Sequence, residues 1–236
     1  GYYNQANKWT TMGYTMLTGM VWSVTQPLFA RLSYNDPERM QRVFRKMLRF
    51  TAFLSCPALF GLALVAPEFI TIAITDKWLT SARLMQLLCV GGAFVPISSF
   101  YSNFIVSQGK SSTFMWNTIA LCLVQLLLLV VMYPYGVTAM VVAYISANTL
   151  WLFVWHWFVQ RLIHLRLIDA LRDVLPFALL AAVAIFAAWG ASLAVAENIY
   201  ASLAVKVIVA IAIYVLLLQL LGAQILKECW GYIWRK

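Results

Sequence analysis

RLSYNDPERMQRVFRKMLR, residues 31–49, is a polar segment between two long apolar runs, and it carries six of the chain's 17 Lys and Arg residues. In a membrane protein, such a basic connector marks the cytoplasmic side. Asp36 can cap a helix whose first turn holds Pro37 and Glu38, because proline suits the first helical position and an acid suits the positive helix end. The segment therefore predicts an interfacial helix that leads into a membrane span, with a solvated charged connector as the alternative.

The composition places the whole chain in a membrane. Hydrophobic residues make up 63% of the sequence, charged residues 11%, and the mean hydropathy is +0.82. A soluble domain carries roughly a quarter charged residues, so we expect an all-α integral membrane protein. The net charge of +9 could suggest nucleic acid as a partner. Because the charges lie in connectors between apolar runs, their placement on the cytoplasmic side explains them better.

Seven apolar stretches are long enough to cross a membrane, since a helical span needs about 20 mostly apolar residues. The connectors form two alternating sets, of which one holds 13 Lys and Arg residues and the other three. The first set is expected in the cytoplasm, which puts residue 1 outside and the C-terminus inside. The basic connectors are 31–49, 108–112, 160–173 and the tail after 225. The predicted spans are 10–30, 50–75, 82–107, 112–133, 137–159, 174–195 and 199–225.

Three of these spans carry polar residues along one helical face. Such stripes avoid lipid and face either other helices, through hydrogen bonds, or a watery cavity. Three stripes in one bundle favour the cavity, although each stripe alone fits both readings. The candidate cavity residues are Thr15, Thr18 and Gln26 in the first span, Asn117 and Gln125 in the fourth, and Asn148 in the fifth.

Proline and glycine interrupt the second and third spans. Pro57 and Pro67 lie in the second, and Gly91, Gly92 and Pro96 lie in the third. Each proline removes a backbone hydrogen bond, so we expect bent helices there.

Lysines near the outer rim are the remaining candidates for contact with a ligand. Lys206 is the one ionisable residue well inside a predicted span; it can snorkel to the surface or contact an anionic lipid or diphosphate. Lys8, Lys77 and Arg83 lie at the outer ends of spans, where they can attract an anionic glycan or remain solvated.

The sequence shows no catalytic constellation. It contains no P-loop, HExxH or GxSxG motif, and His156 and His164 are expected to be interfacial histidines. The four cysteines form no CxxC pair and are expected to be packing thiols. We therefore expect a transport protein rather than an enzyme, with no cofactor and no metal.

Several segments resemble polysaccharide flippases of the Wzx type, in the multidrug/oligosaccharidyl-lipid/polysaccharide exporter superfamily. They include GYYNQANKW at the start, QPLFARLSYNDPERMQRVFRKMLR, and the run from Cys56 to Glu68. Lys77-Trp78 and residues 106–110, VSQGK, also fit the pattern. The resemblance is greatest to the branch that is like colanic acid exporters. It covers residues 1–160, and the last two spans match only in hydropathy.

The resemblance implies a C-terminal half of a transporter with about fourteen spans in two lobes. Residues 1–160 would form most of that lobe, and 161–236 two additional spans and a short cytoplasmic tail. Members flip undecaprenyl-diphosphate-linked oligosaccharide across the bacterial inner membrane by alternating access. The implied partners are this lipid-linked oligosaccharide, membrane lipid, the missing N-terminal lobe and the polysaccharide polymerase machinery, with no nucleic acid. Lys8 and Lys206 are the implied contacts for the diphosphate or lipid.

Two other functions remain open from the sequence. An ion-coupled multidrug exporter of the same superfamily would need a buried acid, and Glu68 and Asp76 lie near the outer boundary. A membrane scaffold that does not transport would instead turn its polar stripes toward partner helices.

Overall fold

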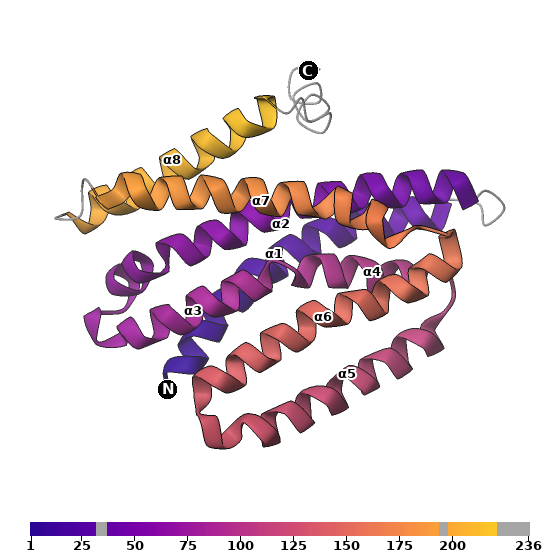
Figure 1. Cartoon of the computed structure of the whole chain (residues 1–236), viewed down its shortest axis with the longest axis horizontal. Helices are drawn as coiled ribbons and strands as arrows, with labels where there is room; N and C mark the ends of the chain where they lie inside the picture. The colour runs from indigo at the N-terminus through magenta and orange to yellow at the C-terminus, as the bar shows by residue number, and fades with distance from the viewer. Residues whose placement is uncertain (32–36, 194–197, 221–236) are drawn as a thin grey trace.

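The computed structural model describes residues 1–31, 37–193 and 198–220 (Figure 1). Within these ranges the chain is helical and contains no strand, as the sequence predicted. The elements are α1 (Tyr2–Arg31), α2 (Pro37–Ala73), η1 (Asp76–Trp78), α3 (Leu79–Gly92), α4 (Val95–Ser107), α5 (Ser111–Met132), η2 (Tyr133–Tyr135), α6 (Val137–Ile163), α7 (Leu167–Ser192) and α8 (Ile199–Leu220). The predicted cap at Asp36, the turn at Glu197, Cys229 and the tail lie outside the described residues.

Six helical segments among the described residues are long and apolar enough to cross a membrane, with α3 and α4 counted as one. This confirms a multi-pass helical membrane protein. The remaining predicted span is the first one, 10–30. It corresponds to α1, which has 30 residues but whose hydropathy is too low for a candidate span. Its threonine, asparagine and glutamine side chains lower the hydropathy of a helix that is otherwise long enough.

The first helix begins earlier than the hydropathy predicted. The span was expected at 10–30, whereas α1 starts at Tyr2. The reason is tertiary packing: Ala6 is fully buried, Tyr2 packs edge-on against Trp78 at 5.2 Å, and Trp9 packs against Phe69 at 5.0 Å. These aromatic contacts stabilise the first turns of α1. The residues there are too polar for hydropathy to predict a membrane span.

The third predicted span is divided into two helices. α3 ends at Gly92 and α4 begins at Val95, with Phe94 donating its N–H to the Gly91 carbonyl at 3.1 Å. Pro96 lacks an N–H and crowds the residue before it, so the regular helical ladder is interrupted here. The predicted bend is confirmed at this position.

The basic segment and the second span form one continuous helix. α2 begins at Pro37, the predicted first helical position, and runs for 37 residues with Pro57 and Pro67 inside it. Its buried face joins an aromatic cluster in which the Phe44 ring lies 4.8 Å from both Phe100 and Phe104. Burial of these rings accounts for a large share of the apolar packing at this end of the bundle.

The helices form three groups (Figure 1). α1, α2, α3 and α4 lie in the middle, α5 and α6 form a hairpin on one side, and α7 and α8 lie on the other against α2. With α3 and α4 counted as one, successive long helices run in opposite directions along the bundle (Figure 1).

Candidate substrate cavity

Two small adjoining hollows lie where α1, α3, α4 and α6 meet. Their volumes are about 160 Å³ and about 40 Å³, and both are lined by Gly91, Val95 and Asn148. Most of their other polar lining consists of hydroxyl groups. The larger hollow adds Ser98, Ser99 and Ser102, and the smaller adds Asn7, Thr10, Tyr14 and Tyr144. A chain this apolar therefore keeps uncharged hydrogen-bonding groups together in the interior of its bundle.

Hydrogen bonds tie α1 to α4 along one side of the hollows. The Trp22 indole donates to Ser99 Oγ at 2.9 Å, and the Asn103 amide donates to Thr25 Oγ1 at 3.3 Å. These uncharged bonds are individually modest, about 0.6 kcal/mol on average in membrane helices. They position the helices without fixing them as strongly as an ion pair.

Gly91 allows α3 and α6 to approach closely at the hollows. A Cβ atom built on this glycine would collide with the side chain of Ile145 on α6. Gly92 has more room, because its nearest neighbour is Thr10 Cγ2 at 3.4 Å. Small residues are what permit such close helix contacts in membranes.

The serines of the hollows and Tyr14 escaped the sequence analysis, whereas Tyr144 lies on the same predicted polar stripe as Asn148. Ser102 lies one helical turn after Ser98 and Ser99, shortly after Pro96. This spacing was the signal that could have indicated a polar helical face. These serines were overlooked because serine is common in membrane helices and carries no charge. Tyr14 was hidden between the threonines that the analysis selected.

The predicted candidates on α1 lie outside both hollows. Thr15, Gln26 and Lys8 are exposed, and the Lys8 ammonium lies 5.6 Å from the Trp9 ring centre. Thr18 is half-buried, and its hydroxyl has no hydrogen-bond partner among the described residues. This part of α1 therefore presents polar groups at the surface of the bundle.

The amides of α5 and α6 bond mainly to each other. Trp151 Nε1 donates to Asn117 Oδ1 at 2.9 Å, and Gln125 Nε2 donates to Asn148 Oδ1 at 3.2 Å. Asn148 Nδ2 in turn donates to the Tyr144 carbonyl at 2.8 Å. Of the three predicted amides, Asn148 lines the hollows, while Asn117 and Gln125 hold the hairpin together.

Lys206 lies in an ion pair rather than alone. Its ammonium bonds to Glu68 on α2, and Ser202 donates to the same carboxylate oxygen at 3.2 Å. Lys206 borders an apolar groove of about 430 Å³ between α2, α7 and α8, whose walls include Pro57, Gly61 and Tyr214. The sequence placed Glu68 and Lys206 near the same outer boundary, but only the packing of α8 on α2 brings them together.

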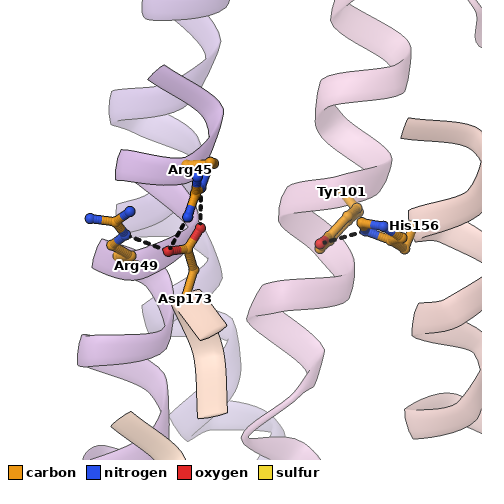
Figure 2. Close-up of polar contacts among 5 residues, drawn as sticks. All are labelled: Arg45, Arg49, Tyr101, His156 and Asp173. Atoms are coloured by element: carbon orange, nitrogen blue, oxygen red, sulfur yellow. Dashed lines mark hydrogen bonds and ion pairs between the residues drawn. The ribbon is translucent and has the colours of Figure 1, made fainter. Parts of the chain in front are cut away.

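A second ion pair holds α7 against α2 at the opposite end (Figure 2). Asp173 Oδ2 accepts from Arg45 Nε at 2.6 Å, and Asp173 Oδ1 accepts from Arg49 Nε at 2.6 Å and from Arg45 Nη2 at 3.1 Å. Asp173 is buried, with 4% of its side chain exposed. The sequence analysis had assigned this acid only to an inner loop.

A wider hollow of about 830 Å³ lies at the end of the bundle that holds the N-terminus. It is lined by the exposed side chains of Arg83, Tyr2 and Tyr3, together with Gln86 and Thr138. Lys77, which precedes Arg83 in the sequence, is also exposed. Both of these predicted basic residues are therefore accessible.

Long apolar helices with small polar hollows between them define the chain as a multi-pass helical membrane protein. Residues 1–83 match the family described as Polysaccharide biosynthesis protein. The teichuronic acid biosynthesis protein TuaB of Bacillus subtilis strain 168 is 25% identical over 195 residues, which are 82% of this chain and 40% of that protein.

Two further relatives agree with this match. The lipopolysaccharide biosynthesis protein WzxC of Escherichia coli K12 is 26% identical over 110 residues, 47% of this chain and 22% of that protein. An uncharacterized membrane protein in the cps region of Klebsiella pneumoniae is 32% identical over 89 residues, 37% of this chain and 18% of that protein. No solved structure matches the chain significantly.

The predicted resemblance to polysaccharide biosynthesis proteins of the Wzx type is confirmed by these matches. The aligned segments span between 18% and 40% of the relatives' own lengths. The chain therefore corresponds to less than half of each of these relatives.

Proposed function

We propose that this chain is the C-terminal part of a flippase that moves undecaprenyl-diphosphate-linked oligosaccharide across the bacterial inner membrane by alternating access. The observation that carries the proposal is the pair of hollows between α1, α3, α4 and α6. Their hydroxyl and amide lining supplies neutral hydrogen-bonding groups of the kind that a sugar chain requires. A hydrophilic headgroup cannot cross hydrocarbon unaided, so such an interior is what a carrier must provide.

The exposed side of α1 extends this polar surface. Thr15 and Gln26 lie on this side. Lys8 is exposed nearer the N-terminal end of α1, where its ammonium group can meet the diphosphate. In a two-lobed carrier this side would face the other lobe across the substrate path. The low hydropathy of α1 relative to the other long helices supports that placement.

The groove between α2, α7 and α8 is suited to the prenyl tail. Its walls are almost wholly apolar, and Lys206 borders it. A tail in this groove would remain in a lipid-like environment while the headgroup crosses between the lobes. Because Glu68 neutralises Lys206, a diphosphate oxygen would have to share or displace that carboxylate.

Substitution in the larger hollow tests the transport proposal. In the full-length protein, Ser99→Leu is expected to stop export of lipid-linked glycan at a normal protein level, because it fills the hollow and removes a hydroxyl. Thr118→Leu is the matched control: Thr118 donates to its own helix backbone at Phe114 and lines neither hollow. Export that survives Ser99→Leu unchanged would refute the cavity assignment.

A membrane scaffold is the second candidate, and the bonding between α5 and α6 favours it. Asn117 and Gln125 face partner side chains rather than the hollows. Cysteines introduced at positions 18, 26 and 117 of the full-length protein separate the two functions. Labelling of positions 18 and 26 by an impermeant thiol reagent supports a watery path, and silence at all three positions supports the scaffold.

A further inference from the structure

His156 and Tyr101 form a buried polar pair between α6 and α4 (Figure 2). Each residue is 4% exposed, and the Tyr101 hydroxyl and His156 Nδ1 share a hydrogen bond of 3.3 Å. The sequence predicted an interfacial histidine here, and the structure instead buries the ring against α4. Ionisable side chains buried within membrane helices are costly and therefore point to function.

The other ring nitrogen provides an independent observation. His156 Nε2 is buried and has no hydrogen-bond partner among the residues that the structure describes. Buried polar atoms without partners are rare in native proteins and call for an explanation. A nitrogen in this condition is a site at which a proton can be bound or released.

The hydroxyl of Tyr101 can serve the ring in both protonation states. A neutral imidazole has one donor and one acceptor nitrogen, whereas an imidazolium donates from both. The hydroxyl can donate to Nδ1 in the first state and accept from it in the second. Tyr101 is thus a positioning residue that holds the ring in place when a proton is gained or lost.

The buried acid on α7 has charged partners of its own. Asp173, the buried acid on α7, already accepts hydrogen bonds from both Arg45 and Arg49 on α2, so its charge is compensated (Figure 2). No acid lies on α3, α4, α5 or α6. The other charged and titratable groups on the elements around the pair are Tyr2, Tyr3, Lys8, Tyr14 and Arg31 on α1, Glu38, Arg39, Arg42, Arg45, Lys46, Arg49, Cys56 and Glu68 on α2, Arg83 and Cys89 on α3, Lys110 before α5, Cys122 on α5, Tyr133 and Tyr135 of η2, Tyr144 and Arg161 on α6, His164 after α6, and Asp169, Arg172 and Asp173 on α7.

We propose that His156, held by Tyr101, is a proton-binding site that couples proton movement to the conformational change of the carrier. This rests on the proposed function. In the conformation described, the imidazole is buried and its Nε2 is closed to water. A conformation that admits water to Nε2 takes up the proton, and return to the buried state releases it. A ligand that binds one of two states more tightly shifts the equilibrium between them, so pH becomes a driving variable.

Hydrogen exchange of the full-length protein in lipid vesicles, without substrate, tests the site independently of transport. Exchange in the α4 and α6 peptides, corrected for the intrinsic effect of pH, is expected to change between pH 5.5 and pH 8 in the unaltered protein. In His156→Asn this pH dependence is expected to vanish. His164→Asn is the matched control, since His164 is exposed at the end of the same helix and asparagine tolerates its left-handed backbone, φ 53°.

Transport supplies the second measurement. With an imposed pH gradient, flipping of lipid-linked oligosaccharide by the unaltered protein is expected to respond by up to about tenfold per pH unit. His156→Asn is expected to lose that response, and His164→Asn is expected to keep it. If no variant flips this substrate while the exchange of α4 and α6 still depends on His156, the proposed function fails and the proton site stands.

Tyr101→Phe keeps the proposal falsifiable if His156→Asn does not fold. This variant removes one hydroxyl and is expected to move the midpoint of the pH-dependent exchange without abolishing it. An unchanged midpoint overturns the role of Tyr101. Unchanged pH dependence in a folded His156→Asn overturns the site itself.

Discussion

The two regions packed against the central helices solve the problem of polarity in a membrane in different ways. Around the hollows of α1, α3, α4 and α6, the polar groups are neutral hydroxyls and amides. Where α7 and α8 pack on α2, the groove is apolar and the polar contacts are ion pairs near its two ends, at Asp173 and at Glu68. Neutral bonds are exchanged at low cost, whereas separated charges in a membrane are costly. The first region is therefore suited to rearrangement, and the second to holding a helical hairpin in place.

The largest effect is expected from breaking the ion pair of α8. Lys206→Met leaves the Glu68 carboxylate buried without its cation, with 12% of its side chain exposed, and should lower the free energy of unfolding by about 3 kcal/mol. The double variant Lys206→Met/Glu68→Gln should recover most of that loss, because no buried charge remains. Chemical denaturation of the full-length protein in detergent measures both. A double variant as unstable as the single one would contradict the explanation.

Breaking the other ion pair should have a somewhat smaller effect. Asp173→Ala leaves Arg45 and Arg49 without their acceptor, but these side chains are 29% and 38% exposed and can reach water. We expect a loss of about 2 kcal/mol in the free energy of unfolding, measured in the same way. Asp169→Ala, one turn earlier on α7, is the control and should cost less than about 0.5 kcal/mol. Equal losses in the two variants would show that helix electrostatics rather than the ion pair is responsible.

The close contact at the hollows is tested by adding one methyl group. Gly91→Ala forces a Cβ atom against Ile145 and should cost about 1–3 kcal/mol through overpacking. Gly190→Ala on α7 meets open space and should be neutral or stabilising by up to about 1 kcal/mol, since alanine favours the helix. Thermal unfolding of the two full-length variants compares them directly. If Gly91→Ala is tolerated as well as Gly190→Ala, α3 and α6 do not depend on this contact.

The smallest effect on stability should accompany a clear effect on transport. Asn148→Ala and Gln125→Ala both remove the hydrogen bond between these two side chains, which should cost about 0.6 kcal/mol in the free energy of unfolding. Asn148→Ala also removes the bond of Asn148 to the Tyr144 carbonyl of its own helix. Only Asn148 lines the hollows, so export of lipid-linked glycan should fall in Asn148→Ala and persist in Gln125→Ala. Equal export in the two variants would contradict a functional difference between Asn148, which lines the hollows, and Gln125, which does not.

The sequence predicted the order of the spans better than the details of the cavity. Hydropathy located the second to seventh spans, and the proline and glycine run at 91–96 located the break between α3 and α4. It failed for the start of α1, where aromatic packing rather than hydropathy extends the helix to Tyr2. Local composition cannot report a contact between residues that are distant in sequence.

The candidate site was predicted only in part. Asn148 lines the hollows, whereas Asn117 and Gln125 gave the same signal in the sequence and form hydrogen bonds between helices. A stripe shows which residues share a helical face and does not show what the face meets. The partners of Lys206 and Asp173 likewise required the packing of α8 and α7 on α2.

The sequence by itself predicted a multi-pass helical membrane protein and the break between α3 and α4, because apolar length and proline chemistry act along the chain. Only the tertiary structure decided which polar groups are neutralised by a partner and which remain available to a ligand. That distinction depends on distances between helices, and those distances are set by side-chain packing across the whole bundle.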